Sequence, residues 1–317
     1  MIKIIIDADT GIDDSLAILH ALKNPEIQVL GICTGCGNTS AEQAAENTLR
    51  LIKLANVDEE VPVVIGARKP LQRAFLGGVE HVHGKNGIGN VKLEKSLRKC
   101  LDVDASDFIY ETAKKHFGEV VLITLGRLTT LALTLDKYPD LKKYLNRVVS
   151  MGGTVYAPGN VGPNSEANFH GDPEAADIVF TSGLDVTVVG LDVTMKTRLT
   201  KEHIEHLKEF GREDCKDIIA YLDEALKYYM NFNRVQDFAM NDCPVHDPLA
   251  IIAVTSPNLY TIKKMKARVE CNGDFSVGRV VVDNRSHSID APYINFCIDV
   301  DSKQAVNKLL SIFCRQY

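Results

Sequence analysis

The amino-acid sequence predicts one α/β domain over residues 1–317, with an open, mostly parallel central sheet flanked by helices. Short β-branched runs alternate with longer amphipathic segments along most of the chain. The short runs are apolar on both faces, which is typical of parallel strands that helices cover on two sides. No repeat, low-complexity tract or linker interrupts the alternation, so we expect a single domain.

The strand–helix units follow one another from the N-terminus. Buried-strand patterns occupy residues 3–7, 29–33, 61–65, 120–124, 147–151 and 185–191. Helical patterns occupy residues 13–23, 40–55, 106–116, 128–135, 173–182 and 201–231. Ser40 and Gln43 match a capping box at the start of the second of these helices. In the tail we expect strands at 269–270, 279–283 and 293–300, followed by a closing helix at 302–313.

Residues 66–101 form a long segment that is rich in glycine and charge. Loops of that length in a compact domain are usually functional. Open α/β sheets bind their ligands at the carboxyl ends of the strands. We therefore look for chemistry at those strand ends and in this long segment.

Composition excludes several classes of protein. A net charge of −6 and a pI near 5.9 disfavour a nucleic-acid binder, which would usually carry a basic face. No apolar run approaches the roughly 20 residues that span a bilayer, so we expect no membrane association. Eight scattered cysteines and no signal-peptide pattern indicate free thiols in a cytoplasmic protein. Cys33 and Cys36 form a CxxC without a second pair, which favours two small residues at a strand end over a metal site.

Four carboxylates, those of Asp7, Asp9, Asp13 and Asp14, follow the first strand within eight residues. They would repel one another strongly without a cation, and hard oxygen ligands of this kind suit Ca²⁺ or Mg²⁺. A solvated acidic turn with one helix cap is the simpler alternative, but it leaves three carboxylates without a role. An EF-hand loop is excluded, because its twelfth position would be Ile18 or His20 instead of glutamate.

A phosphatase is the main rival interpretation. The segment Asp7-Ala8-Asp9-Thr10 resembles the DxDxT nucleophile motif of haloacid dehalogenase-like phosphatases. Asp7 would then attack phosphorus and Asp9 would serve as general acid. This interpretation gives no role to Asp13 and Asp14.

Further polar segments follow strand ends or open helices, and each can reach one crevice. They are Gly37-Asn38, Leu125-Gly126, Met151-Gly152-Gly153, Gly159-Asn160, Glu166-Ala167-Asn168 and His246-Asp247. Carboxamides and carboxylates hydrogen-bond vicinal hydroxyls well, so these segments indicate a buried sugar site. Asp247 would complete a metal shell, and the imidazole of His246 titrates in the range that suits general-acid work. His81 and His83 lie in the long segment, which we interpret as a pocket wall or lid.

With these segments assembled, the chain closely resembles the inosine-uridine nucleoside hydrolase family. Asp7 to Asp14 look like the DxDxGxDD signature of that family. Further matches are Gly37-Asn38, His81 to Gly89, Leu125 to Thr129, Met151 to Gly153, Asn160 to Asn168, Asp172 to Ala176 and His246 to Ala250. The resemblance extends over nearly the whole chain and implies a Rossmann-like nucleoside hydrolase fold.

The resemblance also implies a set of roles. Ca²⁺ would be held by Asp9, Asp14, Asp247 and the backbone carbonyl of Leu125, with Asp7 as support behind them. The residues around the ribose would be Asp13, Asn38, Met151, Asn160, Glu166 and Asn168. Asp9 would deprotonate the water that attacks the anomeric carbon. His246 would stand beside the leaving base and assist its departure. From the residues themselves we expect His81 and Tyr229 to meet the base as well, with Tyr228 and Phe232 as further aromatic candidates.

Departures from the family pattern affect recognition of the base. Arg127, Thr130 and Ala167 stand where the family usually has other residues, and the chain has no Trp for indole stacking. We therefore expect a pyrimidine or broad base preference. The family resemblance implies a small ribonucleoside as the substrate and a homodimer or homotetramer as the assembly. Purine against pyrimidine preference, deoxyribose tolerance and the residues of 66–101 and 228–240 that close over the base stay open. A non-catalytic ribose- or nucleoside-binding protein is the third alternative.

Overall fold

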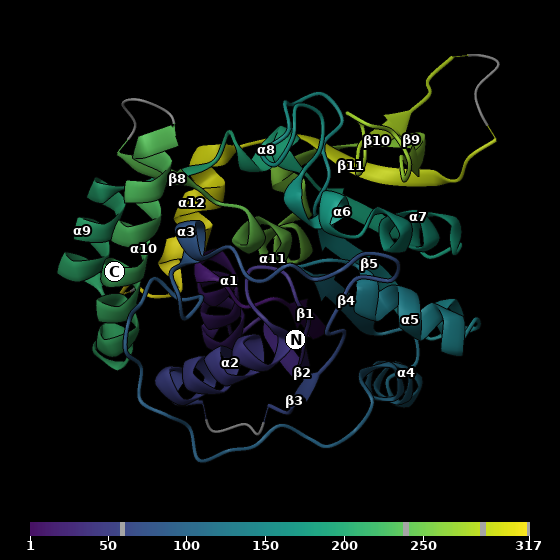
Figure 1. Cartoon of the computed structure of the whole chain (residues 1–317). Coiled ribbons are helices and arrows are strands. Elements are labelled where there is room, and N and C mark those ends of the chain that lie inside the picture. Colours follow the sequence, from purple (N-terminus) through teal and green to yellow (C-terminus); the bar gives the residue numbers. More distant parts are fainter. Residues whose placement is uncertain (58–60, 237–240, 286–289, 316–317) are drawn as a thin grey trace.

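A computed structural model of the chain describes residues 1–57, 61–236, 241–285 and 290–315. Its central sheet joins nine strands in the order β10-β9-β11-β6-β5-β4-β1-β2-β3 (Figure 1). The strands are β1 (Ile2–Ala8), β2 (Ile27–Thr34), β3 (Val63–Ile65), β4 (Val120–Thr124), β5 (Leu145–Met151), β6 (Val186–Val189), β9 (Tyr260–Val269), β10 (Val280–Val282) and β11 (Tyr293–Val300). The prediction of one domain with an open, mostly parallel sheet is confirmed.

Strand β1 lies inside the sheet, between β2 and β4, and is parallel to both. From β1 the chain builds outward to β2 and β3, and it then returns to the other side of β1 with β4, β5 and β6. The strand order therefore reverses between β1 and β4. In open α/β sheets, the crevice at such a switch point is where ligands bind.

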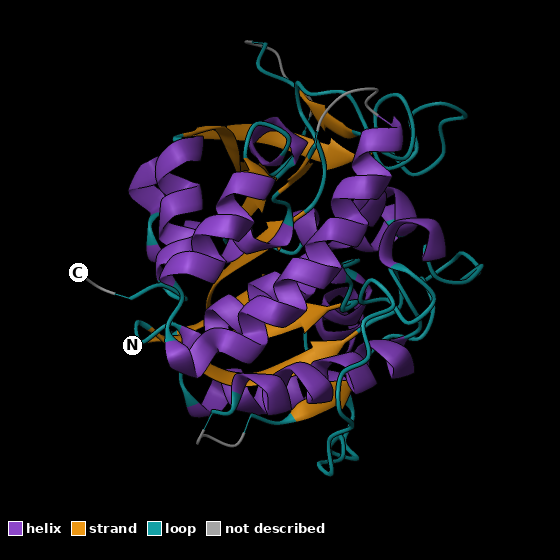
Figure 2. Ribbon diagram, turned by 90° about the vertical axis from the view of Figure 1, so that its left-hand side faces the viewer, coloured by secondary structure: helices purple, strands orange, loops and turns teal. Residues whose placement is uncertain are grey.

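Helices cover both faces of the sheet (Figures 1 and 2). Helices α1 (Ile12–Lys23), α2 (Ala41–Ala55) and α11 (Asp247–Thr255) contribute to one apolar core, and α4 (Ala105–Lys115), α5 (Thr129–Lys137) and α7 (Pro173–Thr181) to the other. In β1, Ile4 and Ile6 belong to the first core and Ile5 to the second. The alternation of side chains along a strand explains why this run had to be apolar on both faces.

Shorter elements and the C-terminal region complete the chain. They are α3 (Glu80–His83), α6 (Ala167–Gly171), α8 (Leu191–Thr194), α9 (Lys201–Phe210), α10 (Lys216–Gln236), α12 (Ser302–Ser311) and a two-stranded sheet of β7 (Arg198–Thr200) and β8 (Asp242–Pro244). The described part of the chain contains no helix with the length and apolarity needed to cross a membrane.

Two predicted elements differ from the structure. The helix expected over 201–231 is divided into α9 and α10, because the backbone at Gly211 and Arg212 pairs with the C-terminal tail at Cys314 and Phe313. Strand β9 begins at Tyr260, well before the expected residue 269. The prediction missed this part of the strand because its lysine-rich first half is exposed and lacks the apolar alternation of a strand. The sheet of β7 and β8 was also not expected, since each strand has only three residues.

Candidate active site

The acidic centre lies at the carboxyl end of β1, where the sheet order reverses. Asp9 follows β1 directly, and Asp14 lies in the first turn of α1. Asn38, just past β2, joins them: its backbone N–H donates to Asp9 Oδ2 at 2.8 Å, and its Nδ2 donates to Asp9 Oδ1 at 3.1 Å and to Asp14 Oδ2 at 2.9 Å. A Cβ at Gly37 would overlap the Asp9 carboxylate, so that position needs glycine.

Three carboxylates approach closely enough to share a cation. One oxygen each of Asp13, Asp14 and Asp247 lie within 4.8 Å of one another, and all three side chains are buried. Asp247 comes from the start of α11, more than two hundred residues along the chain, and α11 packs on α1. The Oδ1 atoms of Asp13 and Asp14 are buried without a hydrogen-bond partner.

These observations fit a hard divalent cation. Burial, together with the neighbouring carboxylates, raises the pKa of Asp14 and Asp247 well above the usual range, and burial raises the pKa of Asp13 to about 7. Burying several like charges is costly unless they are neutralised. An oxygen-only donor set of this kind suits Ca²⁺ or Mg²⁺. The three carboxylates that lie closest together are those of Asp13, Asp14 and Asp247. Asp9 is linked to this group because Asn38 donates hydrogen bonds to both Asp9 and Asp14.

Asp7 lies two residues before Asp9, within strand β1. Within the sheet it is the register partner of Cys33 in β2 and of Thr124 in β4. Burial raises the pKa of Asp7 to about 7, and the nearby Asp9 carboxylate adds to the shift. Its role as support behind the ligands stays a prediction.

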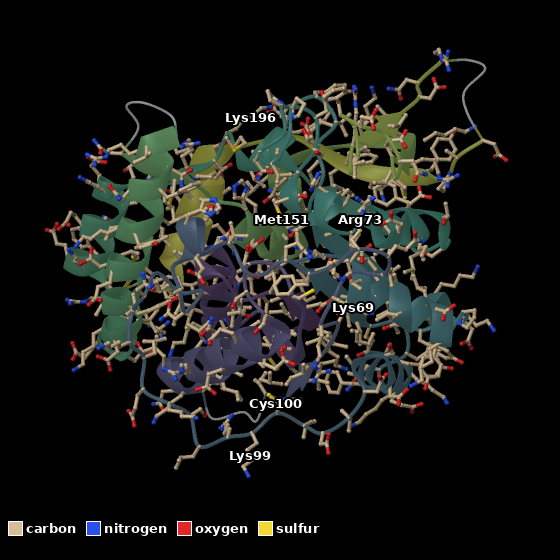
Figure 3. All side chains as sticks on the ribbon, viewed as in Figure 1. Lys69, Arg73, Lys99, Cys100, Met151 and Lys196 are labelled. Atoms are coloured by element: carbon tan, nitrogen blue, oxygen red, sulfur yellow. The ribbon has the colours of Figure 1, made fainter. Side chains whose placement is uncertain are left out.

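A second group of polar side chains surrounds the ends of β4 and β5. Asn168 Nδ2 donates to the Leu125 carbonyl at 2.6 Å and to the Met151 carbonyl at 3.3 Å. The Glu166 carboxylate accepts the backbone N–H groups of Gly153 and Asn168, each at 2.8 Å. Burial raises the pKa of Glu166 to about 7. Met151 is labelled near the middle of the view in Figure 3.

Asn160 joins this group through the backbone, because its Oδ1 accepts the N–H of Ala167 at 3.0 Å. Of the predicted ribose residues that follow β5, Glu166 and Asn168 are therefore joined directly, and Asn160 is bonded to Ala167 between them. Arg127, just past β4, lies with its guanidinium 5.6 Å from the ring centroid of Phe75, and its charge favours the ionised form of Asp9. This departure from the family pattern therefore places a positive charge near the acidic centre.

Two buried histidines stand beside the acidic centre. Nδ1 of His246 lies 2.8 Å from the hydroxyl of Thr194. Nδ1 of His83 accepts the N–H of Ile12 at 3.1 Å and lies 3.9 Å from Asp13 Oδ1, and its ring stacks on that of Tyr229 with centroids 5.9 Å apart. Burial lowers the pKa of His246 to about 4 and that of His83 to about 3. Both imidazoles are therefore neutral at pH 7, so the contact of His83 with Asp13 is not an ion pair.

The sequence prediction chose His81 for the base, but the structure brings His83 to the acidic centre. His81 is exposed, and its ring packs edge-on against Phe232 at 5.7 Å between centroids. Both residues belong to the single turn of α3, and positions two apart in a helix point in different directions. Tyr229 lies on the buried side, stacked on His83. Of the segment 228–240 that was expected to close over the base, residues 237–240 lie outside the described part.

Calcium should raise the melting temperature more at a pH of about 7.5 than at a pH of about 5, because cations bind ionised carboxylates. Asp13, Asp14 and Asp247 have folded pKa values above their unfolded values. In chelator their contribution to stability therefore falls as the pH rises from about 4 through about 7. The cation offsets that loss at the upper end of this range.

Thermal melts with calcium and with chelator at both pH values measure the effect. Subtracting the two melts at each pH removes the contribution of His83 and His246, whose lowered pKa values act in the opposite direction. An equal calcium-dependent shift at both pH values would contradict a site made of these carboxylates.

A family model, a related sequence and two solved structures that match this chain are all described as nucleoside hydrolases or nucleosidases. The chain matches the family described as inosine-uridine preferring nucleoside hydrolase over residues 4–307. It is 40% identical to uridine nucleosidase 1 of Arabidopsis thaliana over 282 residues, which cover 89% of this chain and 82% of that protein. A solved plant nucleoside hydrolase matches with a TM-score of 0.92 and 31% identity over 99% of both chains. A purine-preferring ribonucleoside hydrolase from Gardnerella vaginalis matches with a TM-score of 0.91 and 32% identity over 98% of both chains.

Proposed function

This chain belongs to the inosine-uridine preferring nucleoside hydrolase family, whose members are glycosidases that act on N-glycosyl compounds, and we propose a specific activity for it. The chain is a Ca²⁺-dependent hydrolase of uridine and related ribonucleosides. The products would be the free base and ribose. The observation that carries the proposal is the buried group of Asp13, Asp14 and Asp247 beside a hydrogen-bonded set of ribose-type partners. A haloacid dehalogenase-like phosphatase and a non-catalytic binder are not favoured, because neither accounts for this combination.

The cation would be held by Asp9, Asp14, Asp247 and the Leu125 carbonyl, with Asp13 close to the same centre. When bound, it would lower the pKa of a water molecule and fix the vicinal hydroxyls of the ribose. Asp9 would accept the proton of the attacking water at its carboxylate. Asn38 donates a hydrogen bond to each oxygen of that carboxylate, so Asp9, as the general base, is oriented before the substrate binds.

Cleavage of an N-glycosidic bond develops positive charge on the ribosyl ring. The carboxylates of Asp9, Asp13 and Glu166 would stabilise that charge, because they lie buried where water does not screen them. Asn160 and Asn168 would hold the ribose by hydrogen bonds. Asn38 and Met151 would complete its surroundings.

The departing base would be assisted by His246. Burial lowers the pKa of His246 to about 4, so the imidazole is neutral at pH 7. A neutral ring acts by donating a hydrogen bond from Nε2 to a base that leaves as an anion, and it does not need to hold a second proton. His83 and Tyr229 would form the neighbouring wall of the base pocket, with His81 at the exposed rim.

We propose a pyrimidine or broad base preference. The base side of the site offers a stacked imidazole and phenol and no indole, and a relative with 40% identity bears the name uridine nucleosidase. The expected result is a kcat/KM for uridine at least equal to that for inosine, measured as ribose release from each. A strong preference for inosine would contradict this part of the proposal while leaving the hydrolase activity standing.

Removal of the cation tests the function directly. Incubation with uridine should release free ribose, chelator should abolish the release, and added Ca²⁺ should restore it. A reducing-sugar assay measures the product. Phosphate release from a generic monoester without ribose release would support the phosphatase, and tight uridine binding without turnover would support the non-catalytic binder.

A further inference from the structure

The helical turn α8 contacts two parts of the site, the loop after β5 and His246. No pattern in the sequence indicated a role for this turn. It follows β6 directly, at the carboxyl edge of the sheet. The N–H of Leu191 donates to the Gly153 carbonyl at 3.0 Å. A Cβ on Gly190 would lie 2.6 Å from that same carbonyl oxygen, so α8 and the loop after β5 are in direct contact.

Asp192 holds the loop after β5, which leads to the proposed ribose residues Asn160 and Glu166. Its buried carboxylate accepts three consecutive backbone N–H groups, those of Val155 at 2.8 Å, Tyr156 at 2.7 Å and Ala157 at 3.0 Å. Hydrogen bonds to an ionised acceptor are about twice as strong as those between neutral groups. The loop then runs on to Asn160 and Glu166, so this anchor holds the segment that leads to both of them.

Thr194 holds the other half of the site. Its hydroxyl lies 2.8 Å from Nδ1 of His246, and both side chains are buried. A hydroxyl that donates to Nδ1 selects the tautomer with its proton on Nε2. Thr194 is two residues beyond Asp192, in the same helical turn.

We propose that α8 is a positioning element that sets the distance between the ribose loop and His246, with Asp192 and Thr194 as its positioning residues. The inference rests on the proposed function for its effect on turnover. A displacement of about 1 Å in a reacting group can cost on the order of a hundredfold in rate, so losing either anchor has kinetic consequences. The two anchors have different signatures, because one acts on the sugar and the other on the leaving group.

Asp192→Asn should lower kcat/KM roughly 10- to 100-fold, by the same factor for uridine and for 4-nitrophenyl β-D-ribofuranoside, because both substrates contain the ribose. Amide hydrogen exchange at residues 155–157 should become faster, since the asparagine accepts fewer of the three N–H groups. Asp136→Asn, an exposed position on α5, is the matched control and should change neither quantity. Unchanged exchange at 155–157 would overturn the role of Asp192, whatever the kinetics.

Thr194→Val keeps the shape of the side chain and removes its hydroxyl. It should lower kcat roughly tenfold for uridine while leaving the nitrophenyl riboside nearly unchanged, because nitrophenolate departs without assistance. Thr194→Ser should restore uridine turnover. Equal losses on both substrates, or no rescue by serine, would overturn the role of Thr194.

Hydrogen exchange and NMR distinguish a failure of this inference from a failure of the proposed function. If the wild-type chain releases no ribose, the function fails, and the α8 inference is then decided by hydrogen exchange for Asp192 and by ¹⁵N NMR for Thr194. In NMR spectra, Thr194→Val should change the populations of the two His246 tautomers. Unchanged populations would overturn the inference for Thr194 without reference to turnover.

Discussion

Asp247→Asn should lower kcat/KM for uridine by roughly a thousandfold, because a catalytic cation contributes several kcal/mol to the transition state and each 1.4 kcal/mol corresponds to tenfold in rate. Asp247 is one of the three carboxylates within 4.8 Å of one another. The amide is almost isosteric, so the loss would come from weaker cation binding and a misplaced ribose. Steady-state kinetics across a range of Ca²⁺ concentrations measure it.

The same substitution should have the opposite effect on stability without the cation. In chelator at neutral pH, Asp247→Asn removes one member of a buried group whose like charges repel, so the melting temperature should rise. The calcium-dependent rise in melting temperature should shrink at the same time. Asp136→Asn serves again as control and should leave activity and both melts unchanged. A variant that keeps activity within tenfold and a full calcium response would exclude Asp247 as a ligand.

His246→Ala should lower kcat for uridine and inosine by roughly 10²- to 10³-fold, the cost of removing one hydrogen-bond donor from a developing anion. The reason is that both bases are poor leaving groups, and in the proposed mechanism the buried His246 donates the hydrogen bond that assists their departure. 4-Nitrophenyl β-D-ribofuranoside should react nearly as fast with the variant as with the wild type, because its leaving group is already stable as an anion. Parallel kinetics on the three substrates provide the measurement, and unchanged turnover of uridine and inosine would remove His246 from the mechanism.

The pH dependence provides a second check on His246. Because the imidazole is neutral with a pKa of about 4, its protonation does not limit turnover between about pH 5 and pH 8. The acidic limb of the profile should therefore follow the buried carboxylates that would hold the cation, Asp9 among them, because protons compete with the cation for these groups. An acidic limb in wild type that disappears in His246→Ala would show that the histidine itself titrates in this range.

The local sequence pattern and the rule on strand ends were sufficient to predict the parallel part of the sheet and the edge at which the polar residues gather. The run of isoleucines before Asp7 had to be a buried strand, and polar residues following β2, β4 and β5 had to meet at its carboxyl edge. Both inferences depend only on residues close in sequence and on one rule of topology. They predicted Asn38, Leu125 and Met151 at that edge, and in the structure Asn38 donates hydrogen bonds to Asp9 and Asp14.

Features that depend on long-range pairing could not be predicted in this way. The break at Gly211 arises from the C-terminal tail, about a hundred residues later, and no local pattern reports it. The choice between His81 and His83 depends on how one helical turn faces α1 and α10. Asp192 and Thr194 did follow a predicted strand, but their partners are backbone N–H groups and a histidine that sequence spacing does not identify.

The position of Asp247 at the start of α11 also has a consequence for the order of assembly during synthesis. Asp9 and Asp14 emerge with the first strand and helix, whereas Asp247 emerges only when about three-quarters of the chain has been made. Until then the N-terminal carboxylates lack a member of their group, and the sheet around β1 must form against their repulsion. High affinity for the proposed cation would therefore appear only after Asp247 has been made, so the cation would stabilise the finished domain and have little influence on the nascent one.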